Sequence, residues 1–273
     1  MSSNQNKLSI NGNTLKTIAI ITMFIDHLTY VFAETYMLPK ISSSYIGGAD
    51  LTYTAKDFNL WITIDLIGRG LGRLAFPIFL FLMLEGFLHT RNVWKYALRL
   101  GIFALVSEVP FDLAFNGSCF DISYQNVFFT LLVGLLMMIG FELVSDHVPE
   151  KIAASQRKTM FYTAGLQTLV FLAALIIVHF LKSDYTYMGI AMAAAIYFTR
   201  NHPKKMWIAV MVAMLITMIP SHSNPLELIG CFSFFLIACY NGERGNFNLK
   251  YFFYLFYPVH LLILGLIRMF ILN

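Results

Sequence analysis

Apolar runs of about twenty residues follow one another along almost the whole chain, and this pattern limits the fold more than any other feature. A membrane-spanning helix needs roughly 20 mainly apolar residues, because its backbone polar groups must be satisfied within the helix. Hydrophobic residues make up 58% of the 273 positions and charged residues 12%, against roughly 25% charged residues in soluble domains. The sequence therefore predicts an all-α, polytopic membrane bundle and excludes a disordered chain.

The apolar runs predict about nine transmembrane helices in a single domain over residues 1–273. Residues 58–70 are also apolar but are too few to span, so we expect an interfacial or re-entrant piece there. The first run continues for a full span, so no cleavable signal peptide is expected. The predicted spans are residues 15–37, 71–90, 97–116, 124–144, 160–181, 185–199, 206–220, 226–240 and 251–271.

Lys and Arg are distributed unequally between the two sets of loops. With a cytoplasmic N-terminus, the inner segments hold thirteen of these residues and the outer segments hold six. This bias predicts a cytoplasmic N-terminus and an extracytoplasmic C-terminus. The net charge of +4 then reflects topology, and no nucleic-acid partner is expected. The three cysteines match no metal-binding spacing and no even disulfide framework, so we expect no metal.

Ionisable side chains inside predicted spans are costly in lipid and therefore mark candidate functional positions. Under the predicted topology they form two layers. The outer half and the middle hold Asp26, His27, Arg69, Arg73, Glu108, Asp112, Asn126 and His260. The inner half holds a mostly basic set: Lys16, Glu85, His89, Arg91, Lys95, Arg99 and Glu142.

Purely structural roles are open for several of these side chains. Arg73 could form a helix-locking ion pair with Glu108 or Asp112. Glu85 and His89 could bond along one helix face at i,i+4 spacing. His260 could be satisfied by a backbone carbonyl.

Five segments of the sequence resemble the TraX family in order and spacing. TraX proteins are polytopic membrane proteins named for the enzyme that acetylates the N-terminus of conjugative F-pilin. The resemblance is carried by LKTIAIITMFIDHLTYVF (15–32), GRLAFPIFLFLMLEGFLHTRN (72–92), KYALRLGIFALVSEVPFDLAF (95–115), NVFFTLLVGL (126–135) and FFYLFYPVHLLIL (252–264). Lys16 and His27 also stand at a spacing similar to that of a basic residue and a histidine in the first helix of membrane-bound acyltransferases.

The resemblance implies an acetyltransferase that takes its acetyl group from cytoplasmic acetyl-CoA. The phosphates of such a donor need cations at the inner face. We expect these from Lys16, Arg91, Lys95 and Arg99, with Glu85 and His89 in the same layer. Arg91, Lys95 and Arg99 repeat at i+4 and would form one basic face if their helix begins early.

His27 is the candidate general base of this reaction, because a neutral imidazole can take a proton near working pH. We expect Glu108 or Asp112 to orient it and Asp26 to pair with Arg73. His260 or Asn126 could donate a hydrogen bond to the developing oxyanion. Direct transfer and a covalent acetyl-histidine are both open.

Two other function classes are compatible with the sequence. One is a proton-coupled secondary transporter with Asp26, His27, Arg73 and Glu108 as relay, for which Pro77 and Pro110 would interrupt two spans. The other is an accessory subunit of a conjugation or secretion apparatus. For the acetyltransferase, the acceptor is expected to be a peptide N-terminal amine or an exported glycan, at the cytoplasmic membrane of a bacterium. The sequence predicts no oligomeric state.

Overall fold

The computed structural model describes residues 9–47, 53–151, 156–220, 224–245 and 250–272. Within these ranges the chain is helical, with turns and two isolated bridges but no β-strand. The prediction of an all-α fold is confirmed. The chain forms two compact units, which we call unit 1 (Met1–Phe79, Val109–Asp121 and Asn224–Asn273) and unit 2 (Leu80–Glu108 and Ile122–Ser223). The single domain expected over the whole chain stays a prediction.

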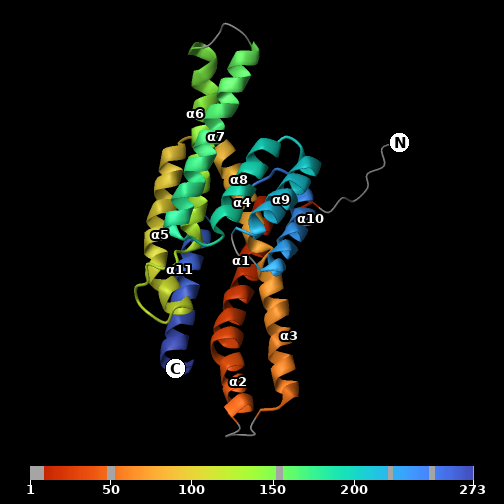
Figure 1. Ribbon diagram of the computed structural model, residues 1–273, viewed down its shortest axis with the longest axis vertical. Helices are drawn as coiled ribbons and strands as arrows, with labels where there is room; N and C mark the ends of the chain where they lie inside the picture. The colour runs from red at the N-terminus through yellow and green to blue at the C-terminus, as the bar shows by residue number, and fades with distance from the viewer. Residues whose placement is uncertain (1–8, 48–52, 152–155, 221–223, 246–249, 273) are drawn as a thin grey trace, which may run out of the picture. The chain divides into compact units, whose positions relative to one another are not determined.

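Unit 1 is built on a long helical segment and the helix that returns beside it. Helix α1 (Gly12–Thr29), the π-helix η1 (Tyr30–Met37) and α2 (Leu38–Gly47) follow one another without a break. Helix α3 (Ala55–Gly72) begins at a capping box formed by Thr54 and Asp57 and runs back along them, as Figure 1 shows in red to orange. Helix α11 (Lys250–Ile267) packs against α1, and η3 (Arg268–Leu272) continues it.

Shorter pieces complete unit 1. They are the first residues of α4 (Ala75–His89), the last turns of α5 (Val93–Phe115), the 3₁₀-helix η2 (Pro225–Phe232) and α10 (Ser233–Ala238).

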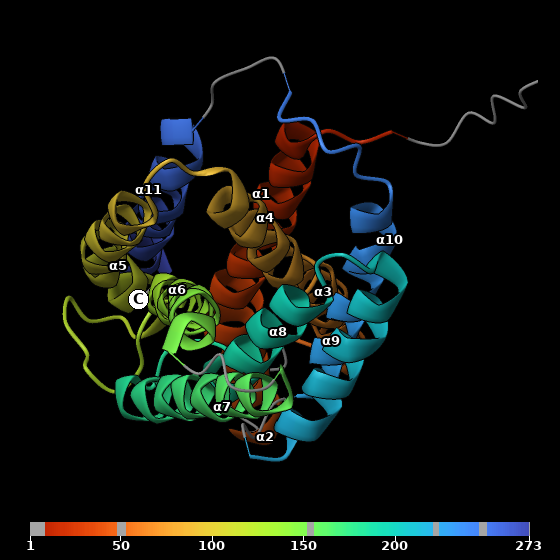
Figure 2. The same cartoon turned by 90° about the horizontal axis from the view of Figure 1, so that it is seen from above.

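Unit 2 contains the rest of α4 and α5 together with four further helices. Helices α6 (Val127–Lys151) and α7 (Gln156–Leu181) pair along their length (Figure 1), and α8 (Thr186–Thr199) contacts both of them and α9 (Pro203–Met218) (Figure 2). Gly140 faces Val170, and Gly134 faces Ala193. Such small residues let helices approach closely where no hydrophobic effect drives them together.

Each predicted span coincides with helical structure. Among the described residues, five helical segments are long and apolar enough to cross a membrane: Gly12–Ser44, Ala55–His89, Val127–Val148, Gln156–Leu181 and Phe252–Phe270. Thr186–Thr199 and Pro225–Ala238 are shorter apolar helices. The number of nine spans and the orientation of the chain stay predictions.

Two expectations about local structure are wrong. Residues 58–70 are not a short re-entrant piece, since α3 has 18 residues and a length of about 27 Å. Pro77 and Pro110 do not break their helices. Pro77 lies in the first turn of α4, where its missing N–H has no intrahelical role, and α5 continues through Pro110.

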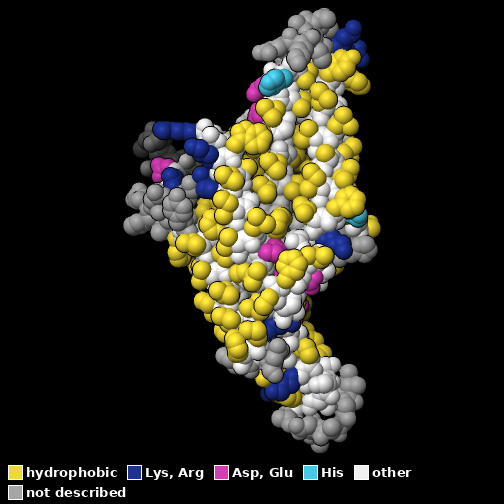
Figure 3. Space-filling view, turned by 90° about the vertical axis from the view of Figure 1, so that its left-hand side faces the viewer, with side chains coloured by type: hydrophobic (Ala, Val, Ile, Leu, Met, Phe, Trp, Pro, Cys, Tyr) yellow, Lys and Arg dark blue, Asp and Glu magenta, His cyan; other side chains and the backbone are white. Residues whose placement is uncertain are grey.

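Hydrophobic side chains dominate the molecular face shown in Figure 3. On α7 the exposed fraction reaches 77% for Phe161 and 78% for Phe180. Apolar helix faces of this kind are stable in lipid but not in water. Together with the five long apolar segments, they make this chain a membrane protein.

The predicted topology can be tested with single cysteines introduced into a variant in which Cys119, Cys231 and Cys239 are replaced by serine. Ser43→Cys follows the first predicted span, and Gln156→Cys lies at the start of α7. We expect an impermeant maleimide to label the first from outside the cell and the second only after permeabilisation. Labelling of both from the same side would contradict the orientation.

Candidate functional site

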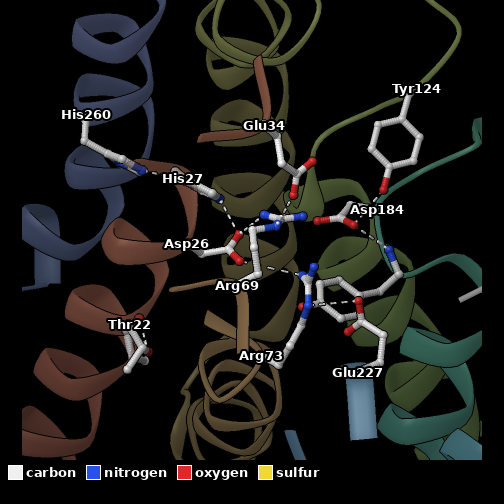
Figure 4. A network of polar contacts seen from close by, with 12 residues as sticks. Thr22, Asp26, His27, Glu34, Arg69, Arg73, Tyr124, Asp184, Glu227 and His260 are labelled. Atoms are coloured by element: carbon white, nitrogen blue, oxygen red, sulfur yellow. Dashed lines mark hydrogen bonds and ion pairs between the residues drawn. The ribbon is translucent and has the colours of Figure 1, made fainter. Parts of the chain in front are cut away.

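The last turns of α1 carry the neighbouring residues Asp26 and His27, whose exposed fractions are 7% and 9%. Neighbouring helical residues point about 100° apart, so the two side chains meet different helices. Figure 4 shows Asp26 directed to Arg69 and Arg73 of the α3 region and His27 directed to His260 of α11. The π-helix η1 begins three residues later, and π-helical turns are frequent at functional sites.

The two buried histidines form a hydrogen-bonded pair. Nδ1 of His27 lies 2.7 Å from Nε2 of His260, and the two rings are nearly parallel, with an interplanar angle of 3°. Nδ1 of His260 lies 2.7 Å from the carbonyl oxygen of Phe256. Phe115 and Tyr257 form edge-to-face contacts with the His27 ring, at centroid distances of 5.2 and 5.9 Å.

The carbonyl of Phe256 determines the tautomers of both rings. A carbonyl oxygen only accepts hydrogen bonds, so Nδ1 of His260 must donate. In a neutral His260, Nε2 is then the acceptor, and Nδ1–H of His27 donates to it. A neutral His27 therefore keeps its lone pair on Nε2, which lies 4.0 Å from Oδ2 of Asp26. His27 is thus oriented by His260 to present a basic nitrogen to a neighbouring carboxylate.

Asp26 belongs to a network of ion pairs whose side chains are mostly buried, Glu34 being the most exposed at 35%. Its Oδ2 accepts a hydrogen bond of 2.7 Å from Nη1 of Arg69, whose Nε lies 2.9 Å from Glu34. Nη1 of Arg73 lies 3.9 Å from Oδ1 of Asp26, and its Nε lies 3.0 Å from Glu227. Removing one member of a buried ion pair costs about 3–5 kcal/mol, because the partner charge remains buried.

Glycines on α3 allow this network to form. Gly68 faces Thr29, and Gly72 faces Asp26, so closely that an added Cβ atom at either glycine would collide with α1. The four-residue spacing is that of small-xxx-small helix contacts in membranes. The close approach of the two backbones brings the guanidinium group of Arg69 within reach of Asp26.

The structure brings together four of the predicted site residues: Asp26, His27, Arg73 and His260. The expected pairing of Asp26 with Arg73 is present, although Arg69 is the closer partner. The prediction that Asp112 orients His27 is wrong on this geometry. Its carboxylate accepts from Asn116 at 3.3 Å and from the backbone N–H of Asp121 at 2.7 Å, while Asp26 is the carboxylate beside His27.

Glu108 and Asn126 pair with each other in unit 2. Asn126 donates from Nδ2 to Glu108 and to the carbonyl of Ala104, and its Oδ1 accepts from the N–H of Phe128 at the start of α6. Both hydrogens of its amide group are therefore engaged. The oxyanion role expected for Asn126 does not fit these bonds, which make it a helix cap.

The hydrogen bonds of His260 exclude the same role for its neutral ring, since its only N–H donates to Phe256. His260 therefore orients His27 instead of donating to an oxyanion as the sequence analysis expected.

The predicted donor-binding residues lie in different places. Lys16 stands on α1, with Nζ 5.4 Å from the ring centroid of Phe253. Lys95 and Arg99 share one face of α5, but Arg91 precedes the helix, which begins at Val93. The helix does not begin early enough to include Arg91, so the condition for one basic face of all three residues is not met. The guanidinium carbon of Arg99 lies 5.7 Å from the ring centroid of Tyr96.

Glu85 and His89 interact along α4, as the i,i+4 spacing indicated. Nδ1 of His89 bonds the backbone carbonyl of Glu85 at 2.8 Å and lies 3.9 Å from its carboxylate. With 73% of its side chain exposed, His89 lies in an exposed contact typical of a helix end. In the part of the chain that the structure describes, no group of three or more His, Cys, Asp or Glu side chains could hold a metal ion.

The sequence analysis placed Arg69 in the outer polar layer but gave it no role in the site, and it assigned no role to Glu34 or Glu227. A signal for Arg69 was present in the segment GRGLGR (68–73). Its glycines four residues apart mark a close helix contact, and its arginines, also four apart, share one helix face.

The matches found among known proteins cover most of the chain. A family model described as "TraX protein" matches residues 11–268. The protein named "Probable fimbrial assembly protein FimC, serogroup H1" from Dichelobacter nodosus is 28% identical over 269 residues, which cover 94% of this chain and 95% of that relative. No solved structure matches the chain.

The close contact between α1 and α3 generates a stability prediction. Gly72→Leu introduces a side chain where Asp26 lies, so we expect a loss of about 1–3 kcal/mol from overpacking and a lower thermal unfolding temperature in detergent. Gly165→Leu on α7 is the control, because no atom would contact its Cβ within 4 Å. Equal unfolding temperatures for the two variants would contradict the packing of α3 on α1.

Proposed function

Because this chain belongs to the TraX family, we propose that it is a membrane-bound acetyltransferase with His27 as its general base. The donor is cytoplasmic acetyl-CoA, and the acceptor is a peptide N-terminal amine or an exported glycan at the extracytoplasmic side of a bacterial cytoplasmic membrane. The single observation that supports this best is the hydrogen bond of 2.7 Å between Nδ1 of His27 and Nε2 of His260, which leaves a neutral His27 with a lone pair on Nε2, beside Asp26. A buried imidazole held in this way is the arrangement that general-base catalysis requires.

The proposed reaction begins with proton removal from the acceptor. As the acceptor nitrogen or oxygen attacks the thioester carbon, its proton passes to Nε2 of His27. The imidazolium that forms keeps its Nδ1–H bond to His260 and gains the attraction of Asp26, whose Oδ2 is 4.0 Å away. Collapse of the tetrahedral intermediate breaks the C–S bond, and the departing CoA thiolate takes the proton back from His27.

The negative charge on the carbonyl oxygen needs a donor in this mechanism. Arg69 and Arg73 are the cations that pair with Asp26, the residue next to His27. Guanidinium groups stabilise oxyanions by hydrogen bonds and charge. Since both already pair with carboxylates, they are held in place before substrate binds. A covalent acetyl-histidine on Nε2 would use the same lone pair and stays an alternative route.

A proton-coupled transporter is the first alternative, because buried charges in a membrane helix can also form a proton relay. An assembly role without chemistry is another, since the relative from Dichelobacter nodosus is named as a probable fimbrial assembly protein. Purified protein that neither binds nor hydrolyses acetyl-CoA would favour one of these two over the acetyltransferase.

Replacing the base tests the proposal directly. His27→Ala removes general-base catalysis, which contributes roughly 10²–10⁴-fold to rate, and we expect acetyl transfer in proteoliposomes to fall by about that factor. The variant should stay folded and keep its affinity for CoA. A His27→Ala protein with undiminished turnover would exclude His27 as the base.

His260 should respond differently to two substitutions. His260→Ala removes the acceptor that orients His27, whereas the amide oxygen of His260→Gln can replace Nε2 as an acceptor. We therefore expect a smaller loss of turnover for His260→Ala than for His27→Ala, and partial recovery for His260→Gln. A larger loss for His260→Ala than for His27→Ala would make His260 the base.

The carboxylate beside the base can be tested by amide substitution. Asp26→Asn removes the charge that stabilises the imidazolium, and we expect turnover to fall at least tenfold, while Asp112→Asn should keep most of the activity because its carboxylate binds the loop after α5. The thermal unfolding temperature of each variant separates this effect from a loss of fold. Greater sensitivity at Asp112 would reverse the assignment.

A further inference from the structure

The loop before α11 is fastened to the first residues of α1. Four backbone hydrogen bonds join the two segments: Ile10 N–H to Cys239 (2.9 Å), Asn241 N–H to Ile10 (3.0 Å), Gly12 N–H to Glu243 (2.7 Å) and Asn13 N–H to Arg244 (3.1 Å). Gly245, with a φ of +90°, supplies the left-handed turn that this path needs. Arg244 is therefore held at a defined position against the beginning of α1.

This attachment brings Arg244 to the side of α1 that carries Lys16. A Cβ atom on Gly12 would lie 3.7 Å from Cα of Arg244, and Gly12 and Lys16 share a helix face at i,i+4 spacing. The Arg244 side chain is exposed and that of Lys16 is half-buried, so they form a cationic pair that leads inward from the surface.

The backbone N–H groups at the start of α1 are already engaged within the chain, so an anion in this region would be bound by the side chains of Lys16 and Arg244. The N–H groups of Gly12 and Asn13 already bond loop carbonyls, and that of Thr14 bonds the side chain of Asn11. The carboxylate of Glu243 lies 3.4 Å from the side-chain nitrogen of Asn241. An anion bound between Lys16 and Arg244 would be attracted by both positive charges.

The cationic pair and the base lie at two ends of one helix seam. Lys16 and His27 are eleven residues apart, about three α-helical turns, so they share one face of α1 at a separation of about 16 Å. Helix α11 runs parallel to α1 along this face, since Lys16 contacts Phe253 and His27 contacts His260. A ligand whose anionic group binds at Lys16 and whose reacting carbon lies at His27 would therefore need a long, thin arm between the two.

We propose that Lys16 and Arg244 bind phosphate groups of the nucleotide part of the thioester donor. This inference rests on the acetyltransferase function proposed above and adds Arg244, which lies outside the five segments quoted in the sequence analysis. The pantetheine arm of the donor then extends along the α1–α11 seam and brings the thioester carbonyl to His27.

The test compares the affinity of the purified full chain for CoA among variants that lose equal charge. Lys16→Gln with Arg244→Gln should raise the dissociation constant of CoA at least tenfold, because charge-assisted hydrogen bonds to phosphate are lost. Arg157→Gln with Lys158→Gln, at the start of α7, is the matched control and should bind CoA as the natural chain does. Arg91→Gln with Lys95→Gln tests the cations near the start of α5.

A donor without phosphates gives a second readout. With S-acetyl-N-acetylcysteamine, an acetyl thioester that carries only the end of the arm, the Lys16→Gln, Arg244→Gln variant should turn over as fast as the natural chain. Equal loss with both donors would overturn the phosphate site and indicate a structural defect. Arg244→Gln alone changes only an exposed side chain, so a lack of any change in its CoA affinity would exclude Arg244 even if the double variant does not fold.

The outcomes also separate this inference from the proposed function. If the natural chain neither binds CoA nor transfers acetyl groups, the proposed function itself fails. If the natural chain is active and the Lys16→Gln, Arg244→Gln variant binds CoA unchanged, the acetyltransferase stands and the phosphate site is wrong. A loss of affinity found only in the Arg91→Gln, Lys95→Gln variant would move the phosphate site to the region of α5.

Discussion

The hydrogen bond of 2.7 Å between Asp26 and Arg69 is the interaction on which the rest of the site depends. A carboxylate or a guanidinium alone within a membrane-spanning segment is costly, so each requires the other. Their pairing holds α1 against α3, with glycines at the contact. Arg69 also reaches Glu34, and Arg73 links Asp26 to Glu227 of η2. The ion pairs therefore connect three separate segments of unit 1.

The positions of the helices could be predicted from the sequence because each apolar run reports directly on burial in lipid. Residues 15–37, 124–144 and 160–181 coincide with α1 and η1, α6 and α7 for this reason. Hydropathy failed for α3, where Asp57, Asp65 and Arg69 interrupt the apolar pattern. These charges do not end the helix. The charge of Arg69, for example, is paired with the carboxylates of Asp26 on α1 and Glu34 on η1.

The partners within the site could not be predicted in the same way. In a regular α-helix Asp26 and Glu34, eight residues apart, would point about 80° apart. The intervening π-helix has wider turns and brings Glu34 back toward the face of Asp26, so that Arg69 can bond both. Hydrophobic periodicity carries no signal for such a turn. The choice of His260 over Glu108 or Asp112 as partner of His27 likewise depends on the packing of α11 on α1, which no local pattern encodes.

His27 is oriented by a histidine and not by a carboxylate, and this affects the charge balance of the site. A further carboxylate in this buried region would need its own cation, while Arg69 and Arg73 are already paired with Asp26, Glu34 and Glu227. A neutral His260, bonded to the carbonyl of Phe256, orients His27 without adding a charge. The site thus has a charged half around Asp26 and a neutral half formed by the two histidines. When His27 takes up a proton, the new positive charge arises at the boundary between the two halves, where Oδ2 of Asp26 lies 4.0 Å away.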